Sequence, residues 1–409
     1  MDVLVESNRT RIQELVPLRY SRMAASPFAF LRGSAQVMAH DLATTPTTGL
    51  EVMLCGDAHI ANFGLFASPE RRLVFDLNDF DEACHGSFEW DVKRFAASIT
   101  VAGRERGLGA AETTSLVIAA MRDYRDWMDR YALMSRLDLY YARIDVDVLM
   151  GYLGDDLRRR AQAMADKATG KNHLKALSKL TTVVDGRWQI VDDAPLVVRN
   201  DSPEIRRRLA AILEQYHATL ASDRQALFDQ YRFVDFARKV VGVGSVGTRC
   251  WMVLLQGPNG GPLFLQFKEA RQASPHVALG RKPATHEGRR VVEGQRALQA
   301  VSDVLLGWGT DETSGVNYFV RQLWDAKGSL DISVMRNSGF SEYVRACGWA
   351  LARAHANTGD APTISGYLGT SDLFGESIAA FAEGYADQTT RDHATLVKAL
   401  ADGRLPKLP

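Results

Sequence analysis

KVVGVGSVGTRCWMVLL, residues 239–255, is followed by a Pro-Asn-Gly-Gly turn at 258–261 and by PLFLQFK at 262–268. These β-rich runs predict a strand, a glycine-rich loop, a second strand, a turn and a third strand. Glycines let a backbone approach a phosphate group closely, and the free N–H groups of such a loop can bind it. A dinucleotide-binding GxGxxG would instead open a helix. The stretch therefore predicts an antiparallel β-unit with a phosphate-covering loop.

This arrangement resembles the hairpin that covers the nucleotide in protein kinases. The resemblance implies that the backbone of Gly242, Gly244, Ser245 and Gly247 lies over the phosphates of ATP. It also implies that Lys268, at the end of the third strand, pairs with the α- and β-phosphates. The alternative interpretation is a glycine-rich bulge beside a surface lysine.

A helix expected at about 286–302 follows Lys268 and carries two acidic candidates for its ionic partner. Glu287 and Glu293 lie 19 and 25 residues after Lys268. We favour Glu293, because it lies inside the helical pattern, where packing fixes its position.

A second set of polar residues begins with GDAHIAN at 56–62. Asp57 is a candidate for orienting or deprotonating a hydroxyl group, and the amide oxygen of Asn62 for binding a hard cation such as Mg²⁺. Acidic residues at the end of a nearby strand, 73–81, would complete such a site, as phosphoryl transfer requires. The alternative is that Asp57 and Asn62 are turn residues that bond to their own backbone.

The order of these motifs is unusual for a kinase. The catalytic-type loop at 57–62 comes first, whereas the glycine loop, the lysine, the helix and a strand expected at 317–324 come late. Joining residue 356 to residue 50 restores the usual order, as a circular permutation would. We therefore expect an α+β fold, namely a circularly permuted, bilobal, protein-kinase-like fold with a small antiparallel β-rich nucleotide lobe and a larger, mainly helical lobe. The predicted parts are a helical lobe with the catalytic loop and metal-binding Asp at 1–231, the β-rich lobe at 232–325, and C-terminal helices at 326–409.

Several longer motifs resemble a bacterial family catalogued as domain of unknown function 2252. They are SPFAFLRG at 26–33, CGDAHIANFG at 55–64, VFDLNDFDE at 74–82, FEWDVKR at 88–94, VGVGSVGTR at 241–249, RVVEGQR at 290–296 and ARAH at 352–355. The family name gives no activity. More locally, residues 56–62 and 79–91 are similar to the catalytic loop, metal-binding Asp and downstream structural Asp of aminoglycoside and choline kinases.

The kinase resemblance implies that Asp57 is the catalytic base and that Asn62 is a Mg²⁺ ligand. Asp79 is the preferred metal-binding Asp, because it lies 12 residues before Asp91, a spacing similar to that in the antibiotic kinases. Asp76 is the rival and Asp81 the third candidate. Position 55 departs from the pattern, with Cys where small-molecule kinases usually have His.

Composition excludes several other classes of protein. The 409 residues carry 49 basic and 49 acidic side chains, so bulk charge does not favour nucleic acid or an anionic membrane. The four cysteines are scattered, no apolar run is long enough to cross a membrane, and the first residues lack the features of a signal peptide. These observations predict a cytoplasmic protein.

Four other side chains invite a functional interpretation. His59 and His355 fit no zinc motif, so hydrogen-bonding roles in the scaffold are expected. Arg32 and Arg249 are expected either to contact a phosphate or acidic group of the substrate, or to tie loops together by pairing with carboxylates.

The leading hypothesis is phosphoryl transfer from ATP, with Mg²⁺, to a hydroxyl group of a small-molecule or protein acceptor. AMP transfer on the same fold and a non-catalytic ATP-binding regulator are the alternatives. A metal-dependent phosphoesterase is disfavoured, because it leaves Lys268 and the glycine loop unexplained. The segment at 130–235 is expected to shape the acceptor pocket.

Overall fold

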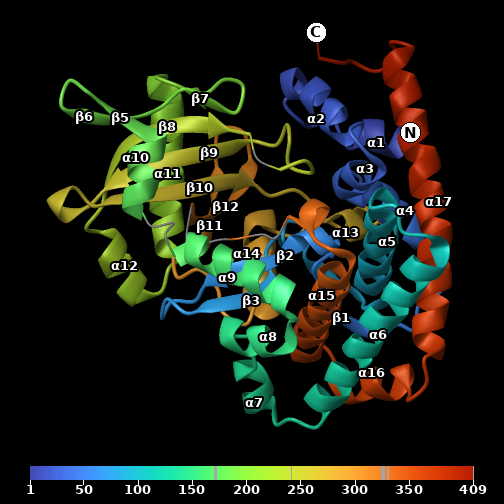
Figure 1. Cartoon of the computed structure of the whole chain (residues 1–409). Helices are drawn as coiled ribbons and strands as arrows, with labels where there is room; N and C mark the ends of the chain where they lie inside the picture. The colour runs from blue at the N-terminus through green and yellow to red at the C-terminus, as the bar shows by residue number, and fades with distance from the viewer. Residues whose placement is uncertain (170–172, 241, 324–327, 329–330, 409) are drawn as a thin grey trace.

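The computed structural model describes residues 1–169, 173–240, 242–323, 328 and 331–408. The fold is α+β, with a β-rich lobe and a mainly helical lobe (Figure 1). The largest sheet is antiparallel, with strand order β11-β12-β10-β9-β8-β7. Its strands are β7 (Val197–Arg199), β8 (Arg232–Lys239), β9 (Cys250–Gln256), β10 (Pro262–Glu269), β11 (Gly307–Asp311) and β12 (Val316–Gln322).

The predicted hairpin lies at the centre of this sheet. The glycine loop connects β8 to β9, and a turn containing η3 (Pro258–Gly260) connects β9 to β10. Lys268 on β10 lies opposite Cys250 on one side and Phe319 on the other. Successive residues of a strand point to opposite faces, and here both faces are covered. The strand, loop, strand, turn and strand expected from the sequence are confirmed.

Helices and a small hairpin cover the two faces of the sheet. Leu209 and Tyr216 pack with Val253 on one face, whereas Leu177 packs with Met252 on the other. The covering elements are α10 (His173–Leu180), β5 (Thr181–Val184), β6 (Arg187–Ile190), α11 (Pro203–Ala218) and α12 (Ser222–Phe228).

The packing shows that the β-rich lobe does not begin at residue 232, where the sequence predicted its boundary. β7 is a strand of the large sheet, and α10 to α12 belong to the same lobe, so the β-rich lobe begins well before residue 232. Helical periodicity shows that a helix buries one face, but it does not show against which element the face packs.

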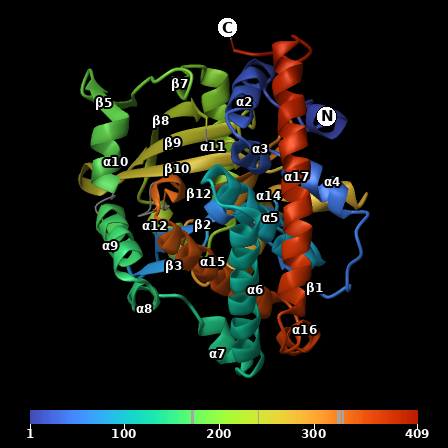
Figure 2. The same cartoon turned by 45° about the vertical axis from the view of Figure 1, so that its right-hand side comes forward.

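The helical lobe is built around long antiparallel helices with one large apolar core (Figures 1 and 2). Its main helices are α5 (Glu89–Glu105), α6 (Ala110–Ala132), α15 (Asn337–Thr358), α16 (Ala361–Leu368) and α17 (Leu373–Ala401). Shorter segments are α7 (Arg136–Tyr141), α8 (Val146–Tyr152), α9 (Asp155–Thr169) and η4 (Ile332–Val334). α15 ends at Thr358, and Gly359 is its C-cap residue. No helix in the described ranges is both long and apolar enough to cross a membrane.

Two short two-stranded sheets carry the acidic motifs between the lobes. β1 (Glu51–Leu54) pairs with β4 (Cys84–Ser87), and β2 (Phe63–Ala67) pairs with β3 (Leu73–Leu77). The loop from β1 to β2 holds residues 55–62, including η2 (Ile60–Asn62), and the turn from β3 to β4 holds residues 78–83. Both polar segments therefore leave paired strands at neighbouring positions. α13 (Ser274–Ala278) and α14 (Glu287–Leu298) follow β10 and lie beside β4 and β1.

The chain ends complete the helical lobe. The first segments are α1 (Asp2–Glu6), η1 (Gln13–Leu15), α2 (Val16–Met23), α3 (Pro27–Gly33) and α4 (Ala35–Leu42). Leu4 and Tyr20 pack with Leu396 and Leu400 near the end of α17, so the two ends of the chain share one apolar cluster (Figure 2). The N-terminal segments therefore lie between α17 and the glycine loop of the β-rich lobe.

Candidate active site

A polar cavity of about 480 Å³ separates the glycine loop from the acidic turns. Asp57, Asp79 and Asp81 line it from the helical lobe, and Gly244 and Ser245 line it from the loop between β8 and β9. Residues before and within the first helices close the remaining side. The cavity therefore brings together segments that are almost 200 residues apart in the sequence.

The backbone before Asp57 is fixed by two unusual features. Gly56 has φ +77°, and a Cβ atom at this position would collide with the backbone of Glu82, so only glycine fits. The N–H groups of Cys55 and Gly56 donate hydrogen bonds of 2.6 and 2.8 Å to the two carboxylate oxygens of Asp91. The position of Asp57 is therefore set by α5, the helix that carries Asp91.

Asp91 belongs to a buried network that includes His355. The Nε2 atom of His355 lies 3.3 Å from Asp91 Oδ2, and its Nδ1 atom lies 2.8 Å from the hydroxyl of Tyr124. His355 is fully buried, and its expected role in the scaffold is what the contacts show. Cys55 also has a scaffold contact, because its thiol donates to the carbonyl oxygen of Asp79 at 3.2 Å. This bond connects the Asp57 loop to the acidic turn.

The Asp57 side chain is held by an arginine that the sequence analysis missed. Arg94 on α5 donates through Nε at 2.8 Å to Asp57 Oδ1, and its Nη2 lies 2.7 Å from the same oxygen. Burial raises the pKa of Asp57, and the positive charge of Arg94 opposes this shift. The spacing could have revealed Arg94, because Asp91 and Arg94 are three residues apart and share one face of a helix.

Lys268 forms a buried charge cluster with Asp79 and Asp81. Its ammonium contacts Asp81 and lies 3.7 Å from Asp79 Oδ1, and its side chain is only 2% exposed. The charges of Lys268 and Arg321 lower the pKa of Asp79 despite its burial, which acts in the opposite direction. Burial and the negative charge of Asp79 raise the pKa of Asp81. One ammonium group thus faces two neighbouring carboxyl groups whose pKa values shift in opposite directions.

The acidic turn has the chemistry needed to hold a divalent cation. The Oδ1 atoms of Asp79 and Asp81 are buried and accept no hydrogen bond. No group of three or more His, Cys, Asp or Glu arranged for a metal occurs among the described residues. Mg²⁺, however, is often bound by one or two carboxylates together with the phosphates of a substrate. Asp79 and Asp81 fit this pattern.

Asp76, the rival metal-binding candidate, has a different role. It is 1% exposed and pairs with the equally buried Arg353 at 3.0 Å. It also accepts hydrogen bonds from the N–H groups of Leu77 and Ala300. Asp76 therefore connects β3 to the end of α14, and it is not among the residues that line the cavity.

Asn62 is placed beside Asp57 but outside the cavity lining. Its side-chain amide donates to the backbone carbonyl of Asp57 at 2.7 Å. This is the turn contact that the sequence analysis gave as the alternative. His59 lies in the same turn, with Nε2 3.8 Å from Asp57 Oδ2. Burial, together with the charges of Arg32 and Arg94, keeps the pKa of His59 well below its ordinary value, so this imidazole is neutral.

Neither predicted glutamate partner contacts Lys268. Glu293, the preferred one, is half exposed and pairs with Arg289 at 2.7 Å on the surface of α14. Glu287 is buried but pairs with Arg290. Arg290 in turn donates to the carbonyl oxygens of Asp81 and Arg271, at 2.9 and 2.6 Å. The helix expected to supply a carboxylate for Lys268 therefore supplies an arginine that supports the acidic turn.

The glycine loop packs against the N-terminal segment. Gly242 and Gly247 have positive φ, and their carbonyl oxygens accept hydrogen bonds from Arg22 Nη1 and from the N–H of Ile12. Gly244 and Ser245 face the cavity, whereas Gly242 and Gly247 shape the turn. Arg249, after the loop, pairs with Glu269 at 3.1 Å and so ties β9 to β10.

Comparison with known proteins gives a family without an activity. No curated protein and no solved structure matches this chain. A family model described as an uncharacterized protein conserved in bacteria, DUF2252, matches residues 11–399. The match spans both lobes and every segment that lines the cavity except the first few residues. The chain therefore belongs to the DUF2252 family.

Proposed function

We propose that this protein is an ATP- and Mg²⁺-dependent phosphotransferase that acts on a hydroxyl group. One observation carries the proposal: the cavity joins Asp57, Asp79 and Asp81 to the glycine loop, with Lys268 paired to the acidic turn. These are the groups that phosphoryl transfer uses for positioning and for neutralising charge. A simple β-bulge with a surface lysine would not bury Lys268 beside two carboxylates.

The proposed fold is a circularly permuted kinase-like one. Supporting it, the end of α15 lies directly against the start of β1: the N–H of Met53 donates to Thr358 Oγ1 at 3.3 Å, and Gly359 abuts Val52. Residues near 356 and 50, which a permutation would join, are therefore close in space. The central hairpin with Lys268 at the end of β10 supports the same interpretation.

In the proposed mechanism, Asp57 orients the acceptor hydroxyl and accepts its proton as the oxygen bonds to the γ-phosphorus of ATP. The bond from that phosphorus to the β,γ-bridging oxygen breaks, and ADP leaves. Arg94 positions the Asp57 carboxylate through its paired donors. Lys268 and the backbone N–H groups of the loop hold the phosphates in place, and Asp79 with Asp81 would hold the cation. Bound Mg²⁺ supplies charge neutralisation on the phosphate oxygens.

The test is a paired measurement of nucleotide binding and product mass. We expect the full-length protein to bind a non-hydrolysable ATP analogue with Mg²⁺, and to add one phosphate to an acceptor from a bacterial metabolite or protein extract. Asp57→Ala should reduce turnover by about 10²–10⁴-fold, since a general base contributes on this scale, with analogue affinity retained. Asp155→Ala, an exposed position on α9, is the control.

Three outcomes would contradict the proposal. A mass gain of one adenylyl group would favour AMP transfer on the same site. ATP binding without consumption, across all acceptors tried, would favour a regulator. Full activity of the Asp57→Ala protein would show that Asp57 is not the base.

A further inference from the structure

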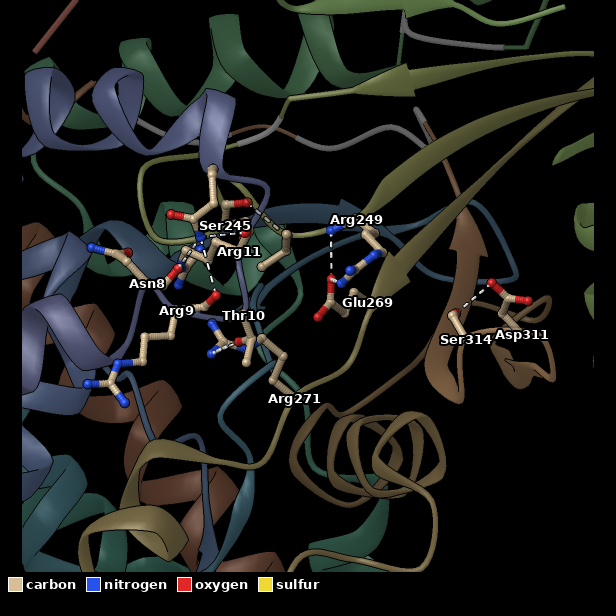
Figure 3. Close-up of polar contacts among 12 residues, drawn as sticks. Asn8, Arg9, Thr10, Arg11, Ser245, Arg249, Glu269, Arg271, Asp311 and Ser314 are labelled. Carbon is tan, nitrogen blue, oxygen red and sulfur yellow. Dashed lines mark hydrogen bonds and ion pairs between the residues drawn. The ribbon is translucent and has the colours of Figure 1, made fainter. Parts of the chain in front are cut away.

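Four arginines form a second wall of the same cavity, which we call the arginine wall. Arg11 precedes η1, Arg19 lies on α2, Arg32 lies on α3, and Arg271 follows β10. All four line the cavity. Figure 3 shows Arg11 beside the glycine loop, where it donates to the carbonyl of Val246, and Arg271 bonded to Thr10. The N-terminal segment therefore brings positive charge to the side facing the acidic turn.

The arginine wall is bonded to neutral oxygens only. Arg11 donates to the carbonyl oxygens of Ser7 and Val246, and Arg271 to the carbonyl of Ser7 and the hydroxyl of Thr10. Arg19 donates to Asn8 Oδ1 and to a carbonyl oxygen. In the part of the chain that the structure describes, no carboxylate lies within ion-pair distance of any of these three arginines or of Arg32.

Two glutamates that line the same cavity are engaged elsewhere. Glu269 accepts from the backbone N–H of Arg249 and pairs with its side chain (Figure 3). Glu82 accepts from the backbone N–H of Ser274. The negative charges of Glu82 and Glu269 act to raise the pKa of Arg11, but among the described contacts neither carboxylate forms an ion pair with it. The positive charge of the arginine wall is therefore balanced only at a distance.

Burial makes this arrangement costly without a ligand. Arg19 is 3% exposed, and its Nε atom and that of Arg32 are buried without a hydrogen-bond partner. Burial and, to a smaller extent, the charge of Arg271 together lower the pKa of Arg19 to about 10. Buried charges are normally paired, and an unpaired buried donor is unfavourable. An anion in the cavity would offset the positive charge of these buried guanidinium groups.

We propose that the arginine wall binds a phosphate group carried by the acceptor, so that the proposed phosphotransferase acts on a phosphorylated hydroxyl compound. The negative charges of Asp57 and Asp79 act on Arg32, which places the Arg32 end of the wall on the side where the acceptor hydroxyl meets its base. The fork of a guanidinium group matches phosphate oxygens. A cavity of about 480 Å³ is of the size that holds a small molecule. This inference rests on the proposed function for the identity of the acceptor.

The test is calorimetric titration of the full-length protein with inorganic phosphate, with and without a saturating non-hydrolysable Mg²⁺–ATP analogue. We expect phosphate to bind in both conditions, and Arg32→Gln or Arg271→Gln to weaken phosphate about tenfold or more, since a charged hydrogen bond contributes on this scale. The same variants should leave analogue affinity unchanged. Arg159→Gln, 72% exposed on α9, is the matched control.

The possible failures can be told apart. Competition between phosphate and the analogue, or a loss of analogue affinity in the arginine variants, would assign the wall to the nucleotide and overturn the inference. Absence of phosphate binding would also overturn it, as would equal binding by all variants with native circular dichroism. Phosphate binding in a protein that binds no nucleotide would support the anion site and contradict the proposed function.

Discussion

Buried charges on the two sides of the cavity are compensated in different ways. On the acidic side, Asp57 pairs with Arg94, and Asp79 and Asp81 share Lys268. On the arginine wall, guanidinium groups contact carbonyl, amide and hydroxyl oxygens. The acidic side is therefore stabilised from within the protein. Within the described residues, the arginine wall contacts no carboxylate partner of this kind, and a bound anion would provide the negative charge.

This difference predicts that loss of a positive charge affects stability unequally on the two walls, and Lys268→Met should show the largest effect. Removing one partner of a buried ion pair leaves an uncompensated charge, which reduces the free energy of unfolding by about 3–5 kcal/mol. Affinity for a Mg²⁺–ATP analogue should be lost as well. Urea denaturation and calorimetry measure the two effects.

The matched change on the other wall is Arg271→Gln. It relieves repulsion within the arginine wall, so the free energy of unfolding should change by less than about 1 kcal/mol. Equal destabilisation by Lys268→Met and Arg271→Gln would show that both walls depend equally on their positive charges for stability.

Gly56→Ala should have the next largest effect. The new methyl group would meet the backbone of Glu82, in addition to the strain of positive φ, and the Asp57 loop would be displaced. We expect a loss of about 1–3 kcal/mol in the free energy of unfolding and a fall in turnover.

Gly186→Ala is the control for Gly56→Ala, because it introduces the strain of positive φ without a steric collision. Gly186 has φ +73° in the exposed turn between β5 and β6, and nothing lies within 4 Å of an added Cβ. This variant should lose only about 1–2 kcal/mol, with turnover unchanged. An unchanged turnover in Gly56→Ala as well would mean that the Asp57 loop does not need its present geometry.

Glu293→Gln should have the smallest effect. Its pair with Arg289 is exposed, so the free energy of unfolding should change by less than about 1 kcal/mol, and nucleotide affinity should be preserved. Glu287→Gln, which loosens Arg290 beneath the acidic turn, should lower stability more. A specific loss of nucleotide affinity in Glu293→Gln would restore it as the partner of Lys268.

Local patterns predicted much of the fold. The glycine-rich hairpin and the acidic turns follow from turn residues and from the pattern of strand residues. The lobe boundary could not be predicted, because a periodic pattern does not identify the surface on which α11 packs. The helix after β10 was predicted, but the partner of Lys268 depends on which turn reaches it in space.

The residues of the candidate site were also predicted only in part. Asp57, Asp79 and Lys268 stand in motifs with recognisable spacing, whereas Asp76 has the same chemistry at a position that is buried against Arg353. Arg11 and Arg19 lie in a segment without a motif, and their role depends on the packing of the chain ends around α17. Spacing reveals residues that act together locally, but it does not reveal a wall assembled from four separate segments.

The most direct test of the central claim is a crystal structure of the full chain with Mg²⁺ and a non-hydrolysable ATP analogue. The account predicts phosphates between the glycine loop and Lys268, a cation on Asp79 or Asp81, and the terminal phosphate facing Asp57. An analogue bound outside this cavity, or bound with Lys268 and the acidic turn unengaged, would contradict it.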